Sequence, residues 1–354
     1  MASHAVTGRH TTGCRRGVGH GERARRYPAR MERRQVGRSG LRVSTLGLGT
    51  MTWGRDTDAL DAGEQLRDFL DAGGTFVDTA ATYGDGDAER LIGDLLGGKV
   101  ARRELVLCTK GGVRAGPLGT TADASRGALL ADLDASLSRL GTDHVDLFLV
   151  ACPDPATPLD ETVSALRLAV TSGRARYVGL SNHPAWAAAR AATLLEGIAG
   201  DGVGLAALEL EYSLLERGVE RDVVPAASAL GVGLLAWSPL GRGVLTGKYR
   251  RALPADSRAA SPHLAAFVDP YLDDASSAVV EAVATAADGL GRAPLEVALA
   301  WLLARDTVAA AIVGARTPAQ LRTSLAAVDL DLPYEVHAAL DDVSAIDVGY
   351  PERW

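Results

Sequence analysis

The run VDLFLVAC at residues 145–152 is the stretch of sequence that decides the fold. Its nearly continuous apolar residues suit a parallel strand buried on both faces better than a strand with one face in water. Leucines recur at helical spacing in the preceding residues 122–140, at Leu129, Leu130, Leu133, Leu137 and Leu140. After the run, Pro158 and the acidic pair Asp160 and Glu161 indicate the start of another helix. A buried strand flanked by helices is the repeating unit of an α/β fold.

Other apolar runs of the same character occur along the rest of the chain. They are residues 45–50 (TLGLGT), 75–80 (TFVDTA), 104–110 (ELVLCTK), 176–181 (RYVGLS), 207–212 (ALELEY), 232–238 (VGLLAWS) and 309–314 (AAAIVG). Helical patterns separate them, including residues 58–72, and Pro294 and Pro318 are typical of the first turns of two late helices. Eight strands, each followed by helix and without a composition break, predict a closed (β/α)8 TIM barrel.

Two segments stand outside this repeat. Residues 33–43 hold an Arg-Ser-Gly turn between two short extended pieces, which predicts a β-hairpin before the barrel. Residues 239–275 form a long irregular stretch after the seventh strand, rich in Gly, Pro, Ala and Arg. Loops of this length inside a compact domain are usually functional, and this one should emerge at the C-terminal mouth of the barrel. We expect it to cover a ligand there.

The formal net charge of −7 is unevenly distributed. Residues 1–30 hold seven arginines and one acidic residue, Glu22, which gives this segment a charge of +6 and leaves −13 on residues 31–354. The segment has low complexity, and three interpretations stay open: a disordered basic tail, an arm that binds an anionic surface, or an upstream misassigned start before Met31. Residues 31–354 are expected to form one barrel domain.

Composition also restricts the class of partner. The body of the chain is too acidic to attract nucleic acid, and no apolar run approaches the roughly 18–20 residues that cross a bilayer. The first thirty residues lack the apolar stretch of a signal peptide. Three widely spaced cysteines, Cys14, Cys108 and Cys152, form no metal or disulfide pattern. We therefore expect a cytoplasmic protein with a small-molecule substrate, no metal, and no nucleic-acid or membrane partner.

Three chemistry-bearing residues are expected at the ends of neighbouring strands. Asp78 ends the second predicted strand, Tyr83 follows it in the next turn, and Lys110 ends the third. A lysine beside a tyrosine stabilises the phenolate and lowers its pKa, so Tyr83 could act as general acid toward a carbonyl oxygen. Asp78 would keep Lys110 charged and oriented. Each residue alone could be structural, but three at one barrel mouth indicate catalysis.

Several motifs of the sequence occur in the same order in a known family. They are LGLGTM at 46–51, DTA at 78–80, YG at 83–84, TK at 109–110, RLGTD at 139–143, GLSN at 179–182, YSL at 212–214, SPLGRG at 238–243 and GARTP at 314–318. With these, the chain from about Met31 to Trp354 resembles the aldo-keto reductase family. The resemblance implies hydride transfer from NADPH, bound across the barrel mouth without a Rossmann domain.

The family's functional residues map onto this sequence. The resemblance implies Asp78, Tyr83 and Lys110 as the catalytic set. It implies cofactor contacts from Gly49, Thr50, Asp78, Ser181, Asn182, Glu209, Trp237, Ser238, Leu240, Arg242, Arg316, Gln320 and Ser324. In this mapping Trp237 stacks on the nicotinamide, Arg242 lies at the pyrophosphate, and Arg316 lies at the 2′-phosphate. An arginine pairs with phosphate through two hydrogen bonds, which favours NADPH over NADH.

Two positions depart from the family pattern. The family's fourth catalytic residue, a histidine at the end of strand four, is Ala151, and a glutamine that contacts the nicotinamide amide is Glu209. Losing one hydrogen-bond donor to an oxyanion typically costs about 10²–10³ in rate. Three interpretations stay open: reduction of a different bond such as a conjugated C=C or a C=N, a substitute donor such as His183, or vestigial catalysis. Cys152 is interpreted as a small buried hydrophobic residue rather than a nucleophile.

Three competing functions are weighed against an NADPH-dependent reductase. The run from Gly241 to Lys248 fails the phosphate-binding spacing of nucleoside triphosphatases, because Arg242 and Tyr249 occupy its required positions. Gly47 and Gly49 lack the third glycine of a Rossmann fingerprint. A NADP(H)-binding regulatory module with vestigial catalysis, as in potassium-channel beta subunits, is the alternative.

Overall fold

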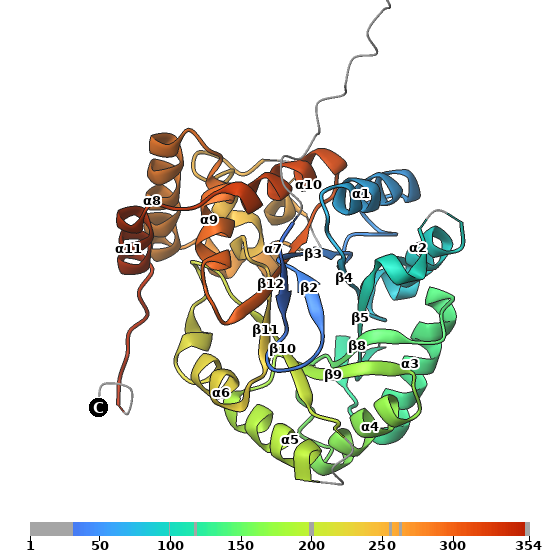
Figure 1. Cartoon of the computed structure of the whole chain (residues 1–354). Helices are drawn as coiled ribbons and strands as arrows, with labels where there is room; N and C mark the ends of the chain where they lie inside the picture. The colour runs from blue at the N-terminus through green and yellow to red at the C-terminus, as the bar shows by residue number, and fades with distance from the viewer. Residues whose placement is uncertain are drawn as a thin grey trace, which may run out of the picture.

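Eight parallel strands close into a barrel in the computed structural model, which describes residues 31–98, 100–116, 119–197, 202–254, 257–261 and 264–350. The barrel strands are β3 (Leu46–Gly49), β4 (Phe76–Asp78), β5 (Val106–Gly111), β8 (Val145–Val150), β9 (Ala175–Ser181), β10 (Leu205–Glu211), β11 (Gly233–Trp237) and β12 (Val308–Gly314). They follow one another in chain order around the barrel, and β12 pairs with β3 to close it (Figure 1). The predicted (β/α)8 barrel is confirmed, and each predicted strand overlaps an observed one.

Helices surround the barrel (Figure 1). They are α1 (Ala59–Asp71), α2 (Asp87–Leu96), α3 (Arg126–Leu140), α4 (Leu159–Thr171), α5 (Ala185–Gly197), α6 (Val223–Leu230), α7 (Ala265–Val268), α8 (Asp274–Leu290), α9 (Pro294–Leu303), α10 (Pro318–Leu325) and α11 (Tyr334–Val343). Short 3-10 turns are η1 (Tyr83–Gly86), η2 (Arg102–Glu104), η3 (Gly218–Glu220), η4 (Gly241–Thr246), η5 (Arg258–Ala260), η6 (Asp269–Tyr271) and η7 (Ala326–Asp329). As predicted, α9 and α10 begin at their prolines, and α4 begins one residue after Pro158.

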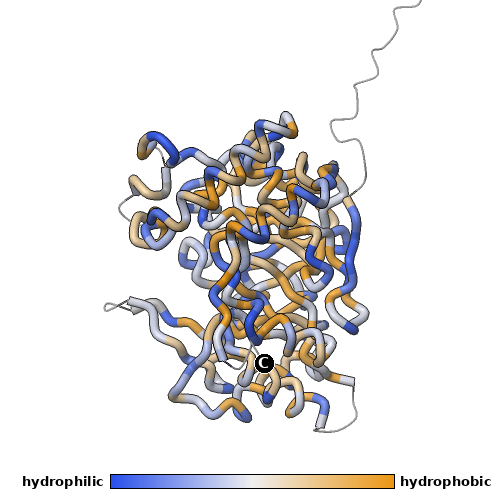
Figure 2. Tube along the Cα trace, turned by 90° about the vertical axis from the view of Figure 1, so that its left-hand side faces the viewer, coloured by the Kyte–Doolittle hydropathy of each residue, from blue (hydrophilic) through white to orange (hydrophobic). Residues whose placement is uncertain are grey.

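Two hydrophobic cores explain why the strands are apolar on both faces. One core fills the barrel, with side chains such as Phe76, Leu147 and Leu235, and the other lies between the strands and the helices. Hydrophobic residues run through the middle of the molecule, in orange in Figure 2, as this arrangement requires. The apolar runs of the sequence therefore mark strands buried between two layers.

The predicted N-terminal hairpin is confirmed and closes the base of the barrel. Strands β1 (Arg33–Gln35) and β2 (Arg42–Ser44) pair antiparallel, and Val36 packs into the core inside the barrel. Gly37 has φ +57°, and a Cβ there would lie 2.3 Å from the carbonyl oxygen of Gly231. Only glycine allows this close approach, which seats the hairpin against the start of β11.

A second hairpin was absent from the sequence-based predictions. Strands β6 (Val113–Gly116) and β7 (Gly119–Ala122) form an antiparallel pair between β5 and α3, so α3 begins later than the predicted helix at 122–140. The long segment 239–275 contains η4, η5, α7 and η6, and α8 begins at Asp274. None of the described helices combines the length and apolar composition that crossing a membrane requires. The interpretations of residues 1–30, including Cys14, concern a segment outside the described residues.

Candidate active site

A cavity of about 600 Å³ lies at the C-terminal ends of the barrel strands. Its size is typical of small-molecule sites. Every predicted site residue except Thr50 lines it: Gly49, Asp78, Tyr83, Lys110, Ser181, Asn182, Glu209, Trp237, Ser238, Leu240, Arg242, Arg316, Gln320 and Ser324. Thr50 is buried, and its hydroxyl donates to the backbone carbonyl of Asp78 at 2.9 Å. Its side chain therefore supports Asp78.

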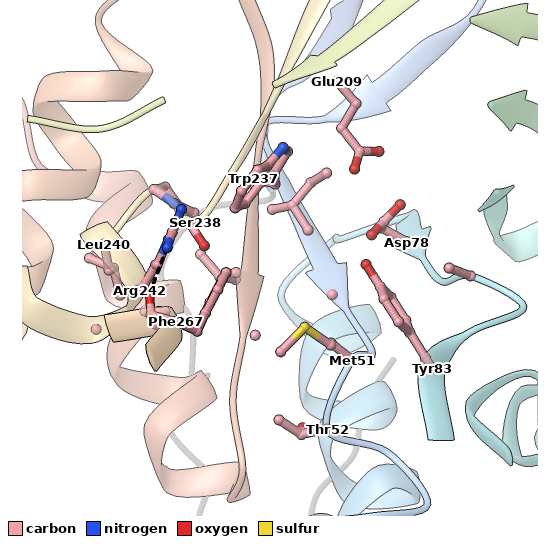
Figure 3. Close-up of a pocket in the computed structure, with 18 of the residues that line it drawn as sticks. Met51, Thr52, Asp78, Tyr83, Glu209, Trp237, Ser238, Leu240, Arg242 and Phe267 are labelled. Atoms are coloured by element: carbon pink, nitrogen blue, oxygen red, sulfur yellow. Dashed lines mark hydrogen bonds between the residues drawn. The ribbon is translucent and has the colours of Figure 1, made fainter. Parts of the chain in front are cut away.

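The three candidate catalytic side chains meet on the floor of this cavity. Lys110 Nζ donates to Asp78 Oδ1 at 2.5 Å and to the Thr79 carbonyl at 3.1 Å. The same Nζ lies 5.4 Å from the centre of the Tyr83 ring. In Figure 3 the hydroxyl end of Tyr83 points toward the Asp78 carboxylate. The fold thus assembles the predicted Asp, Lys and Tyr cluster from three separate chain segments.

Local backbone geometry explains how Tyr83 reaches this cluster. Asp78 is the last residue of β4, and η1 begins at Tyr83 only five residues later. The chain turns sharply because Gly86 adopts φ +90°, and a Cβ there would lie 2.7 Å from Arg139 Cδ. Arg139 in turn donates to the buried carboxylate of Glu89, which also accepts from Thr109 in β5. This network fixes η1 against the strand that carries Lys110.

The pKa of Tyr83 differs from the sequence-based prediction. Burial raises the pKa of Tyr83 above its ordinary value, although Lys110 acts in the opposite direction. Asp78 and Glu209 add to the rise, because nearby negative charge disfavours the phenolate. The prediction of a lowered pKa was wrong for the protein without ligand, since sequence spacing does not report desolvation. Tyr83 therefore retains its proton, as a proton donor must.

The carboxyl group of Glu209 also lies beside the Lys110 ammonium on the floor. Nζ of Lys110 lies 3.3 Å from Glu209 Oε1, and both side chains are buried. Burial alone would lower the pKa of Lys110, but Asp78 and Glu209 raise it well above its ordinary value. Burial and the nearby Asp78 carboxylate raise the pKa of Glu209 to about 8, against the effect of Lys110. The position where the family pattern has glutamine thus carries a carboxyl group whose environment favours the protonated form.

Asn182 forms hydrogen bonds both with Ala151, the position where the family pattern has histidine, and with Trp237, the residue expected to stack on the nicotinamide. Its side-chain nitrogen donates to the Ala151 carbonyl at 2.9 Å, and its side-chain oxygen accepts from Trp237 Nε1 at 3.0 Å. Asn182 adopts φ +60°, a left-handed conformation that asparagine tolerates. Ala151 lines the cavity with a methyl group where an imidazole would offer a hydrogen bond.

The structure does not bring His183 to the cavity. This side chain is buried, its Nδ1 lies 2.7 Å from the Ser181 carbonyl oxygen, and it is not among the residues that line the cavity. His183 therefore does not offer the substitute donor that the sequence left open. Cys152 lines the cavity and is partly exposed rather than buried as expected. Burial and the nearby Asp154 carboxylate raise the pKa of the Cys152 thiol, which disfavours the nucleophilic thiolate.

Arg242 has a protein partner at the predicted pyrophosphate position. Its guanidinium binds both carboxylate oxygens of Glu211, at 2.7 and 2.5 Å, and donates to the Phe267 carbonyl at 2.6 Å. The guanidinium also lies 4.1 Å from the centre of the Phe267 ring (Figure 3). Phe267 stacks against Trp237 with ring centres 6.4 Å apart. The Arg242 side chain thus links the long segment 239–275 to β10 through Glu211. Arg242 also lines the cavity.

The opposite end of the cavity is built on the start of α10. Arg316 precedes this helix, its backbone N–H donates to the Gln320 side chain at 3.0 Å, and Ser324 lies one turn further on. No ion pair joins the Arg316 guanidinium to any of the described residues. An available arginine beside a helix N-terminus is an anion-binding arrangement. It fits the phosphate that distinguishes NADPH from NADH.

Several lining residues were not predicted from the sequence. They include Met51, Thr52, Ala80, Thr82, Val113, Cys152, Thr246, Lys248 and Phe267. The segment 239–275 was expected to cover a ligand at the barrel mouth, and its residue Phe267 lines the cavity there. Nothing in the local sequence singles out Phe267, because its role depends on stacking against a residue 30 positions away. Lys248 was noted only within a rejected phosphate-binding motif.

Comparison with known proteins identifies the family. Residues 45–345 match the Aldo/keto reductase family. The chain is 36% identical over 322 residues to the uncharacterized oxidoreductase YrpG of Bacillus subtilis, covering 88% of this chain and 96% of that protein. It is 34% identical over 307 residues to the L-glyceraldehyde 3-phosphate reductase of Escherichia coli, covering 84% and 88%. It is 32% identical over 326 residues to a probable voltage-gated potassium channel subunit beta of Arabidopsis thaliana, covering 91% and 98%.

The barrel, the cavity and these matches lead to one conclusion. The chain belongs to the aldo-keto reductase family and is an oxidoreductase of that family. Members of the family generally use NAD(P)H. The resemblance inferred from the sequence motifs is therefore confirmed.

Proposed function

We propose that this protein is an NADPH-dependent reductase of a small organic substrate, with Tyr83 as the proton donor. The reduced bond is a carbonyl or an activated, conjugated double bond. The proposal rests on the buried cluster on the cavity floor. There the Lys110 ammonium lies 2.5 Å from Asp78 Oδ1 and 5.4 Å from the centre of the Tyr83 ring. A protein that only binds the cofactor has little physical need for this cluster.

The chain's own residues suit proton donation. Tyr83 keeps its proton at neutral pH because burial raises its pKa. When an oxyanion develops on the substrate, Tyr83 donates its proton, and the Lys110 ammonium stabilises the phenolate that remains. Asp78 holds Lys110 charged and oriented. The phenolate exists only briefly, so the high resting pKa favours the acid form between turnovers.

The residues that line the cavity fit NADPH. When bound, the reduced nicotinamide supplies the hydride. Asn182, Glu209 and Trp237 would hold the nicotinamide end, and Ser238, Leu240 and the backbone at Arg242 would hold the pyrophosphate. Arg316, Gln320 and Ser324 would hold the 2′-phosphate and adenine end. The preference for NADPH rests on the Arg316 guanidinium, whose charge is not neutralised by the described residues.

The catalytic end of the cavity favours an uncharged substrate. Met51, Ala80, Val113 and Cys152 line it after strands β3, β4, β5 and β8, and none of them carries a formal charge. The E. coli relative is named for a phosphorylated aldehyde. In this chain those four residues offer no cation to bind a substrate phosphate, so we favour an apolar carbonyl compound or enone.

A NADP(H)-binding regulatory module is the second candidate. The plant relative is named as a probable potassium channel subunit, and Ala151 removes a hydrogen-bond donor from the catalytic end. In that case the protein would bind NADPH and show no turnover with carbonyl, enone or imine substrates. Tyr83 would then have no chemical role.

The test compares the wild type with Tyr83→Phe. We expect the wild type to oxidise NADPH with at least one substrate of a carbonyl, enone and imine panel. Tyr83→Phe should lower kcat by about 10²–10⁴, because it removes the general acid. NADPH affinity, followed by tryptophan fluorescence, should change less than about twofold. Tight NADPH binding without turnover on the whole panel would favour the regulatory module instead.

A further inference from the structure

We propose that Glu209 is a protonatable positioning residue that sets the charge of the cavity floor and thereby makes the preference for NADP⁺ or NADPH depend on pH. The inference rests on the proposed function, because it concerns the same cofactor site. It assigns to Glu209 a role that the glutamine in the family pattern, which does not ionise, could not perform.

The geometry places two carboxyl groups on one ammonium. Lys110 Nζ lies 2.5 Å from Asp78 Oδ1 and 3.3 Å from Glu209 Oε1. A carboxylate oxygen of Asp78 and one of Glu209 lie within 4.8 Å of each other. Figure 3 shows the two carboxyl groups turned toward one another, above the hydroxyl end of Tyr83. Two neighbouring carboxyl groups attract a cation, and here the Lys110 ammonium is that cation.

The charges on this floor balance only when one carboxyl group is neutral. With both carboxylates ionised, the single ammonium leaves one uncompensated negative charge in a buried place, which is costly. Oε2 of Glu209 accepts no hydrogen bond from the described residues, so an ionised Glu209 would carry an unpartnered oxygen. Asp78 is held by the shorter contact to Lys110. Glu209 is therefore the member that keeps a proton, and its pKa of about 8 agrees with this assignment.

Besides Asp78, three ionisable side chains surround Glu209: Tyr83, Cys108 and Lys110. Burial raises the pKa values of Tyr83 and Cys108, and the pKa of Lys110 is also raised by its carboxylate neighbours. In register with Glu209, β9 presents Ser181 and β11 presents Leu235, neither of which is charged. Ionisation of Glu209 thus adds one net negative charge to the floor as pH rises through about 8.

This added charge acts differently on the two forms of the cofactor. The nicotinamide ring of NADP⁺ is positively charged and that of NADPH is neutral. Glu209 lines the cavity at the position that the family pattern assigns to the nicotinamide amide. An ionised Glu209 should therefore strengthen NADP⁺ binding relative to NADPH binding. By linkage, NADP⁺ should lower the pKa of Glu209 more than NADPH does.

The experiment measures dissociation constants for NADP⁺ and NADPH at pH 6.5 and 9.5, using tryptophan fluorescence. In the wild type, the ratio of the NADP⁺ constant to the NADPH constant should fall about tenfold between these pH values, a typical size for coupling within a protein. In Glu209→Gln the ratio should change less than about twofold. Both cofactors carry the 2′-phosphate, so its titration cancels in the ratio.

Two further variants keep the test specific. Glu209→Asp retains a carboxyl group and should restore part of the pH dependence. Glu281→Gln removes a carboxylate from the surface of α8, where it pairs with Arg250, and should behave like the wild type. Thermal unfolding at pH 6.5 confirms that each variant is folded.

The possible results separate the two proposals. A ratio that does not change with pH in the wild type, or that changes equally in Glu209→Gln, overturns the role of Glu209 and leaves the proposed function standing. Failure of the wild type to bind either cofactor overturns both proposals. Loss of the pH dependence in Glu281→Gln as well would assign the effect to overall charge and would also overturn the role of Glu209.

Discussion

Ala151 is the single residue with the largest expected effect on substrate choice. Its methyl group leaves space beside Asn182 and Cys152 at the catalytic end of the cavity, and it cannot donate a hydrogen bond to an oxyanion. A conjugated substrate can use this space to present its β-carbon rather than its carbonyl carbon. The wild type should therefore reduce an enone faster than a simple aldehyde.

The variant Ala151→His tests this expectation. The added imidazole should raise kcat for an aldehyde by about 10- to 100-fold, within the range of one oxyanion donor, and should slow reduction of a bulky enone. Steady-state rates with one aldehyde and one enone give the comparison, with NADPH affinity as the control. The idea fails if the wild type already reduces the aldehyde at about 10 s⁻¹ and the histidine changes neither rate nor preference.

Among the elements, the start of α10 should determine cofactor preference. Arg316 lies just before this helix, where a phosphate would gain both a bidentate arginine and the helix N-terminus. Arg316→Ala should weaken NADPH binding by about 10- to 100-fold, the size of a charge-assisted hydrogen bond, and should leave NADH binding within about threefold. Fluorescence titration with both cofactors measures the difference.

An arginine within α10, Arg322, provides the matched control. Arg322 pairs with Glu64 and Asp68 of α1 and does not line the cavity. Arg322→Ala removes the same charge a few residues further along the chain, away from the cavity, so the ratio of NADPH to NADH affinity should stay at the wild-type value. Equal NADPH and NADH affinities in the wild type would contradict the role given to Arg316.

At the scale of the whole molecule, Glu209 links stability to pH. Its folded-state pKa of about 8 lies above the ordinary value of 4.5, so the folded protein holds a proton that the unfolded chain releases. The free energy of unfolding should therefore fall as pH rises from about 4.5 to 8, because unfolding then releases a proton. Below and above this pH range, the contribution of Glu209 to the free energy of unfolding does not change with pH.

The comparison with Glu209→Gln isolates this contribution. The variant lacks the titrating group, so its stability relative to the wild type should increase between pH 5 and pH 8. Denaturant unfolding at several pH values measures the difference. A difference between the two proteins that stays the same at every pH would show that Glu209 does not change its protonation on unfolding.

The sequence by itself predicted the eight barrel strands, several helix starts and the position of the site, but not the hairpin of β6 and β7. Nearly continuous apolar runs predicted all eight barrel strands, because a strand covered on both faces must be apolar on both. Pro294 and Pro318 predicted two helix starts, because proline suits the first helical position. Parallel strands end at the same edge of a barrel, so strand-end residues such as Asp78 and Lys110 could be expected to meet. These features depend on local periodicity and chain direction, which a sequence records directly.

Only the tertiary structure decided the charges and partners within the site. Burial reversed the expected direction of the Tyr83 pKa, and His183 is not among the residues that line the cavity. Arg242 pairs with Glu211, 31 residues away in the sequence, and Phe267 stacks on Trp237, 30 residues away. A pKa depends on desolvation and on charges a few ångströms away, and stacking depends on the relative placement of two separate segments. No local pattern encodes such distances, because they exist only once the barrel has closed.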